Sequence, residues 1–174
     1  MSANDLDKKY SEPALTLIKL CVERGYGFMY GGSEYGLMKM ASQLVKSLNG
    51  HSIAVSAKEF ASVVNQKADE IIICKNIGER KKMFMEKSDA IVALPGGTGT
   101  LDELTDVIAH KKLYLFNKPV VLLNTRGFWD GLVMQYHRMF ADGFLLKNPD
   151  DLFLSDDDPK NILKFIQTTL YTSV

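Results

Sequence analysis

The stretch Ala90–Glu103 reads AIVALPGGTGTLDE. Its first five residues are apolar and end at a proline, which is typical of a short buried strand, and the residues after it have a helical pattern. The first amides of a helix have no partner within it and carry a partial positive charge. Glycines let the chain turn with φ > 0 and let a ligand approach the backbone closely. The stretch therefore predicts a strand, a loop and a helix that hold an anion without a lysine.

Short apolar runs and amphipathic segments alternate on both sides of this stretch. The expected strands are 26–30, 51–55, 70–74, 90–94, 119–124 and 151–155. The expected helices are 10–24, 35–49, 78–88, 101–115, 128–141 and 159–171, the last with Asp158 as N-cap and Pro159 at its first position. This alternation predicts an α/β fold, a Rossmann-like three-layer α/β/α arrangement with a mostly parallel sheet, in one domain over 1–174.

Parallel strands joined by right-handed crossovers end at one rim of the sheet, where open α/β sheets bind ligands. Two further segments are expected at this rim. The first contains Gly31, Gly32 and Gly36, between a strand and a helix. The second contains Arg80 and Lys81, near the start of the helix after strand 70–74. A tight turn in the first and a solvated charged helix face in the second remain alternatives.

The glycine-rich loop also has a purely structural alternative. Thr100 and Glu103 have the spacing T-x-x-E of a capping box, in which Thr100 caps the helix and Glu103 reaches back to the Thr100 amide. That interpretation leaves Gly96, Gly97 and Gly99 without a role. Neither a Walker lysine nor the G-x-G-x-x-G dinucleotide fingerprint is present.

Composition narrows the function classes. The 174 residues have a formal net charge of zero, which argues against a nucleic-acid partner, and the apolar runs are too short to span a membrane. Cys21 and Cys74 are far apart in apolar segments, which indicates buried thiols in a reducing compartment, so we expect a cytoplasmic protein. The three histidines are dispersed, so no metal site is expected.

The motifs together resemble those of the LOG family, the cytokinin-activating phosphoribohydrolases long labelled as lysine decarboxylases. PGGTGTLDE resembles the family signature PGGxGTxxE, GGSEYGLM resembles its glycine loop, and Arg80 with Lys81 matches its Arg-Lys pair. The resemblance covers about residues 10–146 and identifies the chain as a single LOG-like nucleotide-binding domain.

The resemblance implies hydrolysis of the N-glycosidic bond of a nucleoside 5′-monophosphate, AMP or a cytokinin-type N6-modified AMP, to free base and ribose 5-phosphate. Arg80 and Glu103 would be the catalytic pair. The substrate would be bound by Gly31, Gly32, Gly36, Lys81, Gly96, Gly97, Thr98, Gly99 and Thr100. No cofactor is implied, and a homodimer or higher homo-oligomer is. The same phosphate cradle occurs in non-catalytic nucleotide or molybdenum-cofactor carriers and sensors, which is the alternative function.

The chain departs from the family pattern in three places that matter. One is just before Arg80, where Ile77 and Gly78 stand in place of the Met-His of plant-type members. The family begins with an apolar strand, whereas this chain opens at MSANDLDKKY, so that first strand is expected to be missing and Ser2, Ala3 and Asn4 to be the turn after it. Ala109 and His110 stand where plant-type members have a Thr-Trp pair. If this part of the helix contacts the base, the difference favours AMP over a prenylated nucleotide as the substrate.

Overall fold

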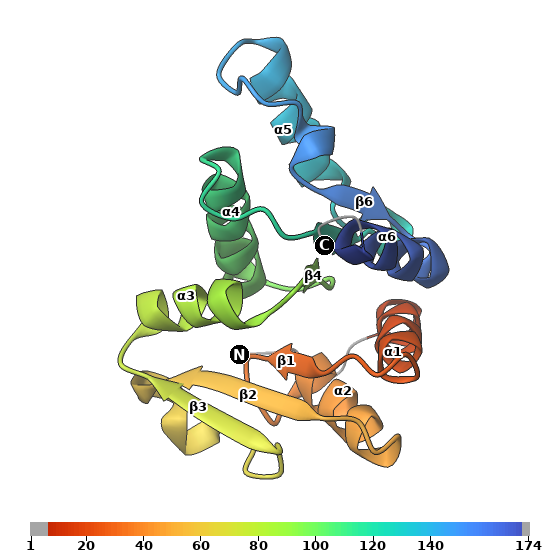
Figure 1. The fold of residues 1–174 in the computed structure, drawn as a ribbon, viewed down its shortest axis with the longest axis vertical. Coiled ribbons are helices and arrows are strands. Elements are labelled where there is room, and N and C mark those ends of the chain that lie inside the picture. Colours follow the sequence, from red (N-terminus) through yellow and green to blue (C-terminus); the bar gives the residue numbers. More distant parts are fainter. Residues whose placement is uncertain (1–6, 172–174) are drawn as a thin grey trace. The chain divides into compact units, whose positions relative to one another are not determined.

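The structure, a computed structural model, describes residues 7–171. The chain forms two compact units, Met1–Ser88 and Asp89–Val174. Each unit contains a three-stranded parallel sheet with its own helices (Figure 1). The prediction of one domain over 1–174 stays a prediction. Among residues 7–171, no helix combines the length and apolar character needed to cross a membrane.

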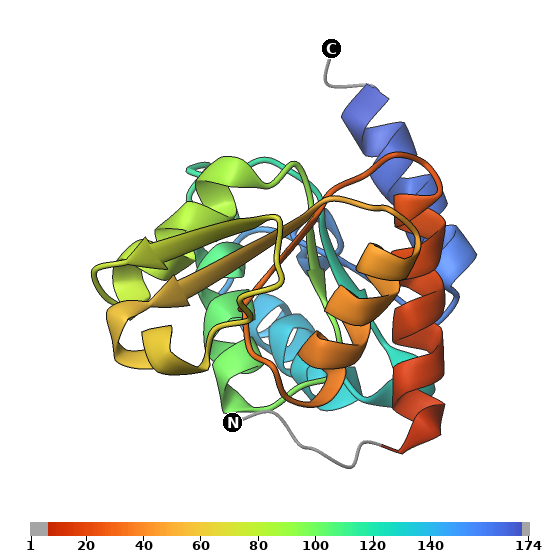
Figure 2. The same cartoon turned by 90° about the horizontal axis from the view of Figure 1, so that it is seen from below.

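The first unit is built on the sheet β1-β2-β3. Its elements in chain order are α1 (Lys8–Val22), β1 (Phe28–Tyr30), α2 (Gly36–Ser47), β2 (Ser52–Ala57), the 3-10 helix η1 (Lys58–Val63), β3 (Glu70–Cys74) and α3 (Ile77–Lys87). Helix α3 packs on one face of the sheet, and α2 and η1 lie on the other (Figures 1 and 2). Because all three strands are parallel, the loops after β1, β2 and β3 leave the same edge of the sheet.

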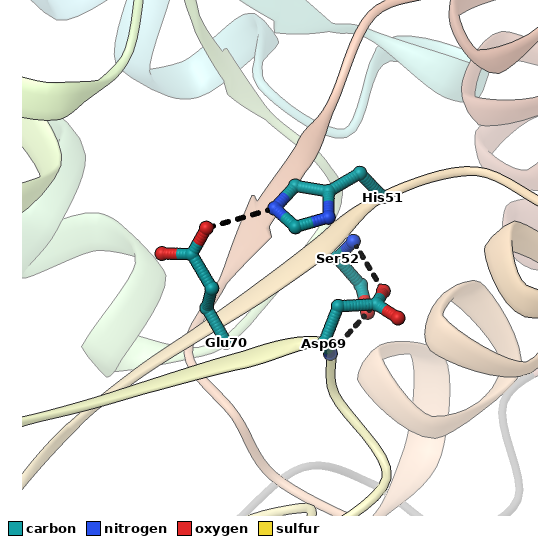
Figure 3. A network of polar contacts seen from close by, with 4 residues as sticks. All are labelled: His51, Ser52, Asp69 and Glu70. Atoms are coloured by element: carbon teal, nitrogen blue, oxygen red, sulfur yellow. Dashed lines mark hydrogen bonds and ion pairs between the residues drawn. The ribbon is translucent and has the colours of Figure 1, made fainter.

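A polar network joins β2 to β3 at the opposite edge, where both strands begin (Figure 3). The carboxylate of Asp69 accepts hydrogen bonds from the backbone N–H of Ser52 at 2.8 Å and from its hydroxyl at 2.7 Å. Next to this pair, Nε2 of His51 lies 3.0 Å from Oε1 of Glu70. The hydrogen bonds from Ser52 favour the ionised carboxylate and lower the pKa of Asp69. The network fixes the register that pairs Ile53 with Glu70.

The second unit is built on the sheet β4-β5-β6. Its elements are β4 (Ile91–Ala93), α4 (Thr98–Lys112), β5 (Val120–Leu123), η2 (Thr125–Gly127), α5 (Asp130–Ala141), η3 (Pro149–Asp151), β6 (Leu154–Asp156) and α6 (Pro159–Tyr171). The central strand β5 is fully buried, as expected for a parallel strand with a neighbour on each side. Helix α6 begins as predicted, since the backbone N–H of Lys160 donates to the Asp158 carboxylate at 2.8 Å.

The α/β class and the parallel pairing are confirmed, with the strands distributed over two three-stranded sheets. The last strand begins at Leu154 and not at residue 151, because the segment Pro149–Asp151 forms a 3-10 turn that the apolar pattern did not reveal. The 3-10 helix η1 was likewise not predicted. The proposed turn at Ser2, Ala3 and Asn4 lies outside the described residues.

Both cysteines are unpaired thiols. Cys74 is buried at the end of β3, and Cys21 is partly buried on α1. Burial raises the pKa of Cys21 to about 11 and also raises the pKa of Cys74. Both are therefore protonated packing residues near neutral pH and not nucleophiles.

Candidate functional site

The glycine-rich loop of the second unit connects β4 directly to α4. Helix α4 begins at Thr98, with Gly97 as its N-cap in an extended conformation and no side-chain hydrogen bond at the cap. Gly97, Thr98 and Gly99 are exposed. The first amides of a helix have no partners within it, so they are available to an anion at this exposed end.

The structural alternative of a capping box with Thr100 as N-cap is not formed. Thr100 is the third residue of α4 and not its N-cap, because the helix starts three residues earlier than the T-x-x-E spacing requires. Its side chain folds back over Gly96: a β-carbon at Gly96 would lie 2.8 Å from Cβ of Thr100 and would also collide with its hydroxyl. Gly96 is therefore required by the packing of Thr100.

Gly97 and Gly99 differ from Gly96 in this respect. A β-carbon at either position would meet no atom within 4 Å beyond its chain neighbours and its own helical turn, so no tertiary contact among residues 7–171 requires glycine there. The expectation that the loop glycines supply a positive φ is also wrong, since Gly96, Gly97 and Gly99 are not among the described residues with positive φ. The remaining physical role for glycine at positions 97 and 99 is to let a ligand come close to the backbone.

In the first unit, the glycine loop after β1 meets the helix after β3. The guanidinium of Arg80 lies directly against Gly31, where a β-carbon would overlap its Nη2 atom and lie 3.2 Å from the sulfur of Met38. Nε of Arg80 donates a 3.0 Å hydrogen bond to the carbonyl of Val55 at the end of β2. Its Cζ lies 5.3 Å from the ring centroid of Phe84, within cation–π range. These contacts position the guanidinium at the rim.

The rest of this loop is shaped by the segment before β3. Gly32 has φ +75°, and a β-carbon there would lie 2.8 Å from Cγ2 of Val64. The backbone N–H of Asn65 donates to the carbonyl of Gly32 at 2.6 Å, and its amide donates to the hydroxyl of Tyr30 at 2.8 Å. For Gly32 the tight-turn interpretation is thus correct. Gly36, with φ +55°, is the first residue of α2.

The remaining predicted site residues are placed on helices that start at a rim. Lys81 follows Arg80 in the first turns of α3 and is partly buried. Glu103 is also partly buried and lies on α4, about one turn beyond Thr100. Arg80 and Lys81 belong to the first unit and Glu103 to the second. The roles of these residues stay predictions.

An open pocket of about 510 Å³ lies beside the loop of the second unit. It is lined by Gly96, Gly97, Thr98, Leu101, Phe128, Trp129, Gly131, Leu132 and Gln135. The sequence motifs did not indicate Phe128, Trp129 or Gln135 as residues beside this loop. The strand order could have indicated these residues, because β5 pairs with β4 and the loop after β5 leaves the sheet at the same end as the loop after β4. Ala109 and His110, near the other end of α4, do not line this pocket.

The histidines have local partners. His51 pairs with Glu70, Nδ1 of His110 lies 2.8 Å from the carbonyl oxygen of Asp106, and Nε2 of His137 lies 3.6 Å from Oδ1 of Asp150. Within residues 7–171, no group of three or more His, Cys, Asp or Glu side chains could hold a metal ion.

Comparison with known proteins gives sequence relatives over most of the chain. A family model described as "Possible lysine decarboxylase" matches residues 38–166. The chain is 32% identical over 160 residues to cytokinin riboside 5′-monophosphate phosphoribohydrolase LOG5 of Arabidopsis thaliana, covering 91% of this chain and 70% of the relative. It is 35% identical over 164 residues to the probable cytokinin riboside 5′-monophosphate phosphoribohydrolase LOGL9 of Oryza sativa subsp. japonica, covering 93% and 72%.

Solved structures share the fold at lower sequence identity. The molybdenum cofactor binding protein from Rippkaea orientalis aligns with a TM-score of 0.71 at 24% identity, covering 97% of this chain and 91% of its own. The molybdenum cofactor carrier protein from Chlamydomonas reinhardtii aligns with a TM-score of 0.73 at 22% identity, covering 98% and 94%. At these identities the likeness shows the fold alone.

Proposed function

Because the chain belongs to the LOG family, we propose that it hydrolyses the N-glycosidic bond of a nucleoside 5′-monophosphate, releasing free base and ribose 5-phosphate. The observation that carries the proposal is the loop before α4. Gly97 and Gly99 leave the start of the helix open to a ligand, and no tertiary contact in the described part of the chain explains why they are glycines. A phosphate bound by these amides would position the ribose for attack at C1′.

We assign the catalytic roles to Arg80 and Glu103. Water attacks C1′, a C–O bond forms, and the C1′–N bond breaks with its electron pair leaving on the base, which takes up a proton from solvent to become the free base. The carboxylate of Glu103 accepts the proton of the attacking water and stabilises the positive charge that develops on the ribose. Arg80 contacts the substrate through its rigid guanidinium. Gly31, Gly32, Gly36 and Lys81 complete the substrate site in this proposal, and the reaction needs no cofactor.

The proposed substrate is AMP or a cytokinin-type N6-modified AMP. The sequence relatives carry cytokinin riboside 5′-monophosphate in their names, which supports an adenine nucleotide. The two unpaired cysteines support a reducing compartment, so the cytoplasm is the proposed location.

We further propose that the protein is a homodimer or higher homo-oligomer. The segments after α4 and after α5 expose large apolar side chains, which are Leu113, Tyr114, Leu115, Phe144 and Leu146. We call these five residues the apolar end patch. Tyr114 is 82% exposed and Leu146 is 89% exposed, and Nζ of Lys147 lies 4.4 Å from the ring centroid of Tyr114, which brings the two segments together. Exposed apolar side chains on two neighbouring segments support contact with a second copy.

A product assay tests the proposed reaction. Purified protein is incubated with AMP, GMP, CMP, UMP or isopentenyl-AMP, and free base and ribose 5-phosphate are followed by chromatography. Release of base from at least one nucleotide is expected. Tight nucleotide binding without release of base would contradict the proposal and favour the carrier or sensor function.

A further inference from the structure

We propose that the pocket beside the loop of the second unit binds the nucleobase, with Phe128 as its stacking surface and Gln135 as the residue that selects adenine. The inference rests on the proposed function, because it takes the phosphate to bind at Gly97–Gly99. It concerns a separate question, which is what part of the protein distinguishes one base from another.

The pocket starts at the loop itself. Gly96, Gly97 and Thr98 of the loop line it together with residues at the beginning of α5. A ligand held by the first amides of α4 therefore has this space directly beside it. Its volume of about 510 Å³ lies within the range of roughly 300–1,000 Å³ that is typical of small-molecule sites. Leu101 and Leu132 add apolar side walls, which suit the faces of a flat heterocycle.

Phe128 presents an aromatic surface in this pocket. Its side chain is 42% exposed, and its ring lies edge-on to the ring of Trp129, with centroids 4.9 Å apart and an interplanar angle of 86°. Trp129 is only 4% exposed, so Phe128 rests on a buried neighbour while part of its ring stays open. A base can stack on such a ring whatever its identity, because every base has a π-face.

The turn that carries Phe128 is fixed by hydrogen bonds. The amide oxygen of Asn124 accepts from the backbone N–H of Trp129 at 2.7 Å, and its nitrogen donates to the carboxylate of Asp130 at 2.8 Å. Gly127, with φ +72°, packs so closely against Asp130 that a β-carbon would lie 3.0 Å from its Cγ. The backbone beside Phe128 is therefore fixed before a ligand binds.

Gln135 supplies polar selectivity at the same pocket. It lies one and a half turns into α5 and is exposed, and its side chain makes no hydrogen bond within the part of the chain described. A carboxamide both donates and accepts, which matches adenine, where N7 accepts and N6–H donates side by side. An N6-modified adenine retains one N6–H and the same N7. Guanine presents two acceptors at these positions and cannot satisfy both ends of the amide.

The experiment measures binding of three ligands by calorimetry: ribose 5-phosphate, which has no base, and the carbocyclic analogues of AMP and GMP, which have no glycosidic bond to cleave. The variants are Phe128→Leu, which keeps an apolar side chain but removes the ring, and Gln135→Leu, which removes the amide. Phe128→Tyr keeps the ring. Phe140→Leu is the matched control, because Phe140 is a similarly exposed phenylalanine of α5, 41% against 42%, and does not line the pocket.

Phe128→Leu is expected to weaken both carbocyclic nucleotides by about tenfold, within the range of base–aromatic stacking. Gln135→Leu is expected to weaken the AMP analogue by about tenfold and to leave the GMP analogue nearly unchanged. Ribose 5-phosphate should bind to both variants within twofold of the parent, and Phe128→Tyr and Phe140→Leu should bind all three ligands like the parent.

Three results would overturn the assignment. These are unchanged nucleotide affinity in both variants, equal losses for ribose 5-phosphate and the nucleotides, or equal losses for the AMP and GMP analogues in Gln135→Leu. Each of these leaves the proposed reaction standing if the parent protein binds ribose 5-phosphate and releases base from a nucleotide. If the parent protein binds none of the three ligands, the proposed function itself fails.

Discussion

The guanidinium of Arg80 lies against the backbone of Gly31, and there is no room between them for a methyl group. The two residues come from different parts of the first unit, one after β1 and one at the start of α3. The parallel sheet brings them together because both strands end at the same edge. Glycine at position 31 is thus required by the position of the Arg80 guanidinium and not by the conformation of its own loop.

Gly31→Ala is expected to lower turnover about as much as Arg80→Ala, because the added methyl group forces the guanidinium away from the rim. The thermal midpoint should change little, since the clash is with the end of a flexible side chain. The double variant should be no worse than Arg80→Ala alone, as measured by kcat/KM in a double-mutant cycle. Gly27→Ala is the control, since its β-carbon would make only an ordinary 3.8 Å contact with the carbonyl of His51. Additive losses would contradict the coupling.

Gly97→Val should abolish nucleotide binding and preserve the thermal midpoint, because the side chain would enter open space where the phosphate is proposed to bind. Gly96→Ala should instead lower the thermal midpoint, because the methyl group displaces Thr100 from the first turn of α4. Calorimetry with ribose 5-phosphate and thermal denaturation of both variants separate the two effects. A Gly97→Val protein that folds and binds normally would disprove the phosphate cradle.

Glu103→Gln should reduce release of base by about 100-fold or more, the range for a positioned acid–base group, and should leave nucleotide affinity within a few-fold. The substitution keeps the size of the side chain and removes only its ability to accept the proton of water. The measurement is the product assay together with calorimetry. Asp102→Asn is a control on the same helix, next to Glu103 and exposed. Unchanged turnover in Glu103→Gln would remove Glu103 from the reaction.

Asp69→Asn should destabilise the protein in a pH-dependent manner. The pKa of Asp69 is lowered in the folded state, first by the hydroxyl of Ser52, then by its backbone N–H, and also by His51. Its stabilising effect is therefore fully present above the unfolded-state pKa of about 3.9 and is lost as the pH falls through the lower folded-state value. The difference in urea midpoint between Asp69→Asn and the parent should thus shrink below about pH 4. A difference independent of pH, or an equal effect of Asp157→Asn at an exposed aspartate, would contradict this.

Leu115→Ser combined with Phe144→Asp should convert the oligomer to monomers, because both substitutions place polar groups in the apolar end patch. Light scattering after gel filtration measures the mass. Tyr171→Asp is the control, since Tyr171 is 77% exposed at the end of α6 and outside the patch. If the parent protein is already monomeric, the proposed oligomer is wrong. If the double variant keeps the parent's mass, the patch is not the contact.

Much of the fold could be predicted because local chemistry determines it. Strand β3 coincides with the predicted segment 70–74, and α6 begins at the proline that follows Asp158. The start of α4 could not be located from spacing alone, because Gly97 and Thr100 are both acceptable N-cap residues. The packing of Thr100 against Gly96 decides between them, and that contact exists only in three dimensions.

The candidate site could likewise be predicted only in part. The loop 95–100 and Arg80 were predicted because glycines and an arginine at strand ends carry a local signal. The contact between Arg80 and Gly31 depends on sheet order, and Gln135 lies on a helix whose local sequence gives no hint of a pocket. Phe128 is a large apolar residue of the kind expected in a core, and only its 42% exposure in the structure shows that it is not a core residue.

The side chain of Thr100, packed over Gly96, ties the loop to the helix that follows it. A loop fixed in this way has already lost most of its conformational entropy when the protein folds. A phosphate bound there, as we propose, would meet amides already in place, so little of its binding free energy would be lost in ordering the chain. Association should then follow a single kinetic phase without a slow rearrangement, and even an isolated phosphate group should be held by geometry that a disordered loop could not offer.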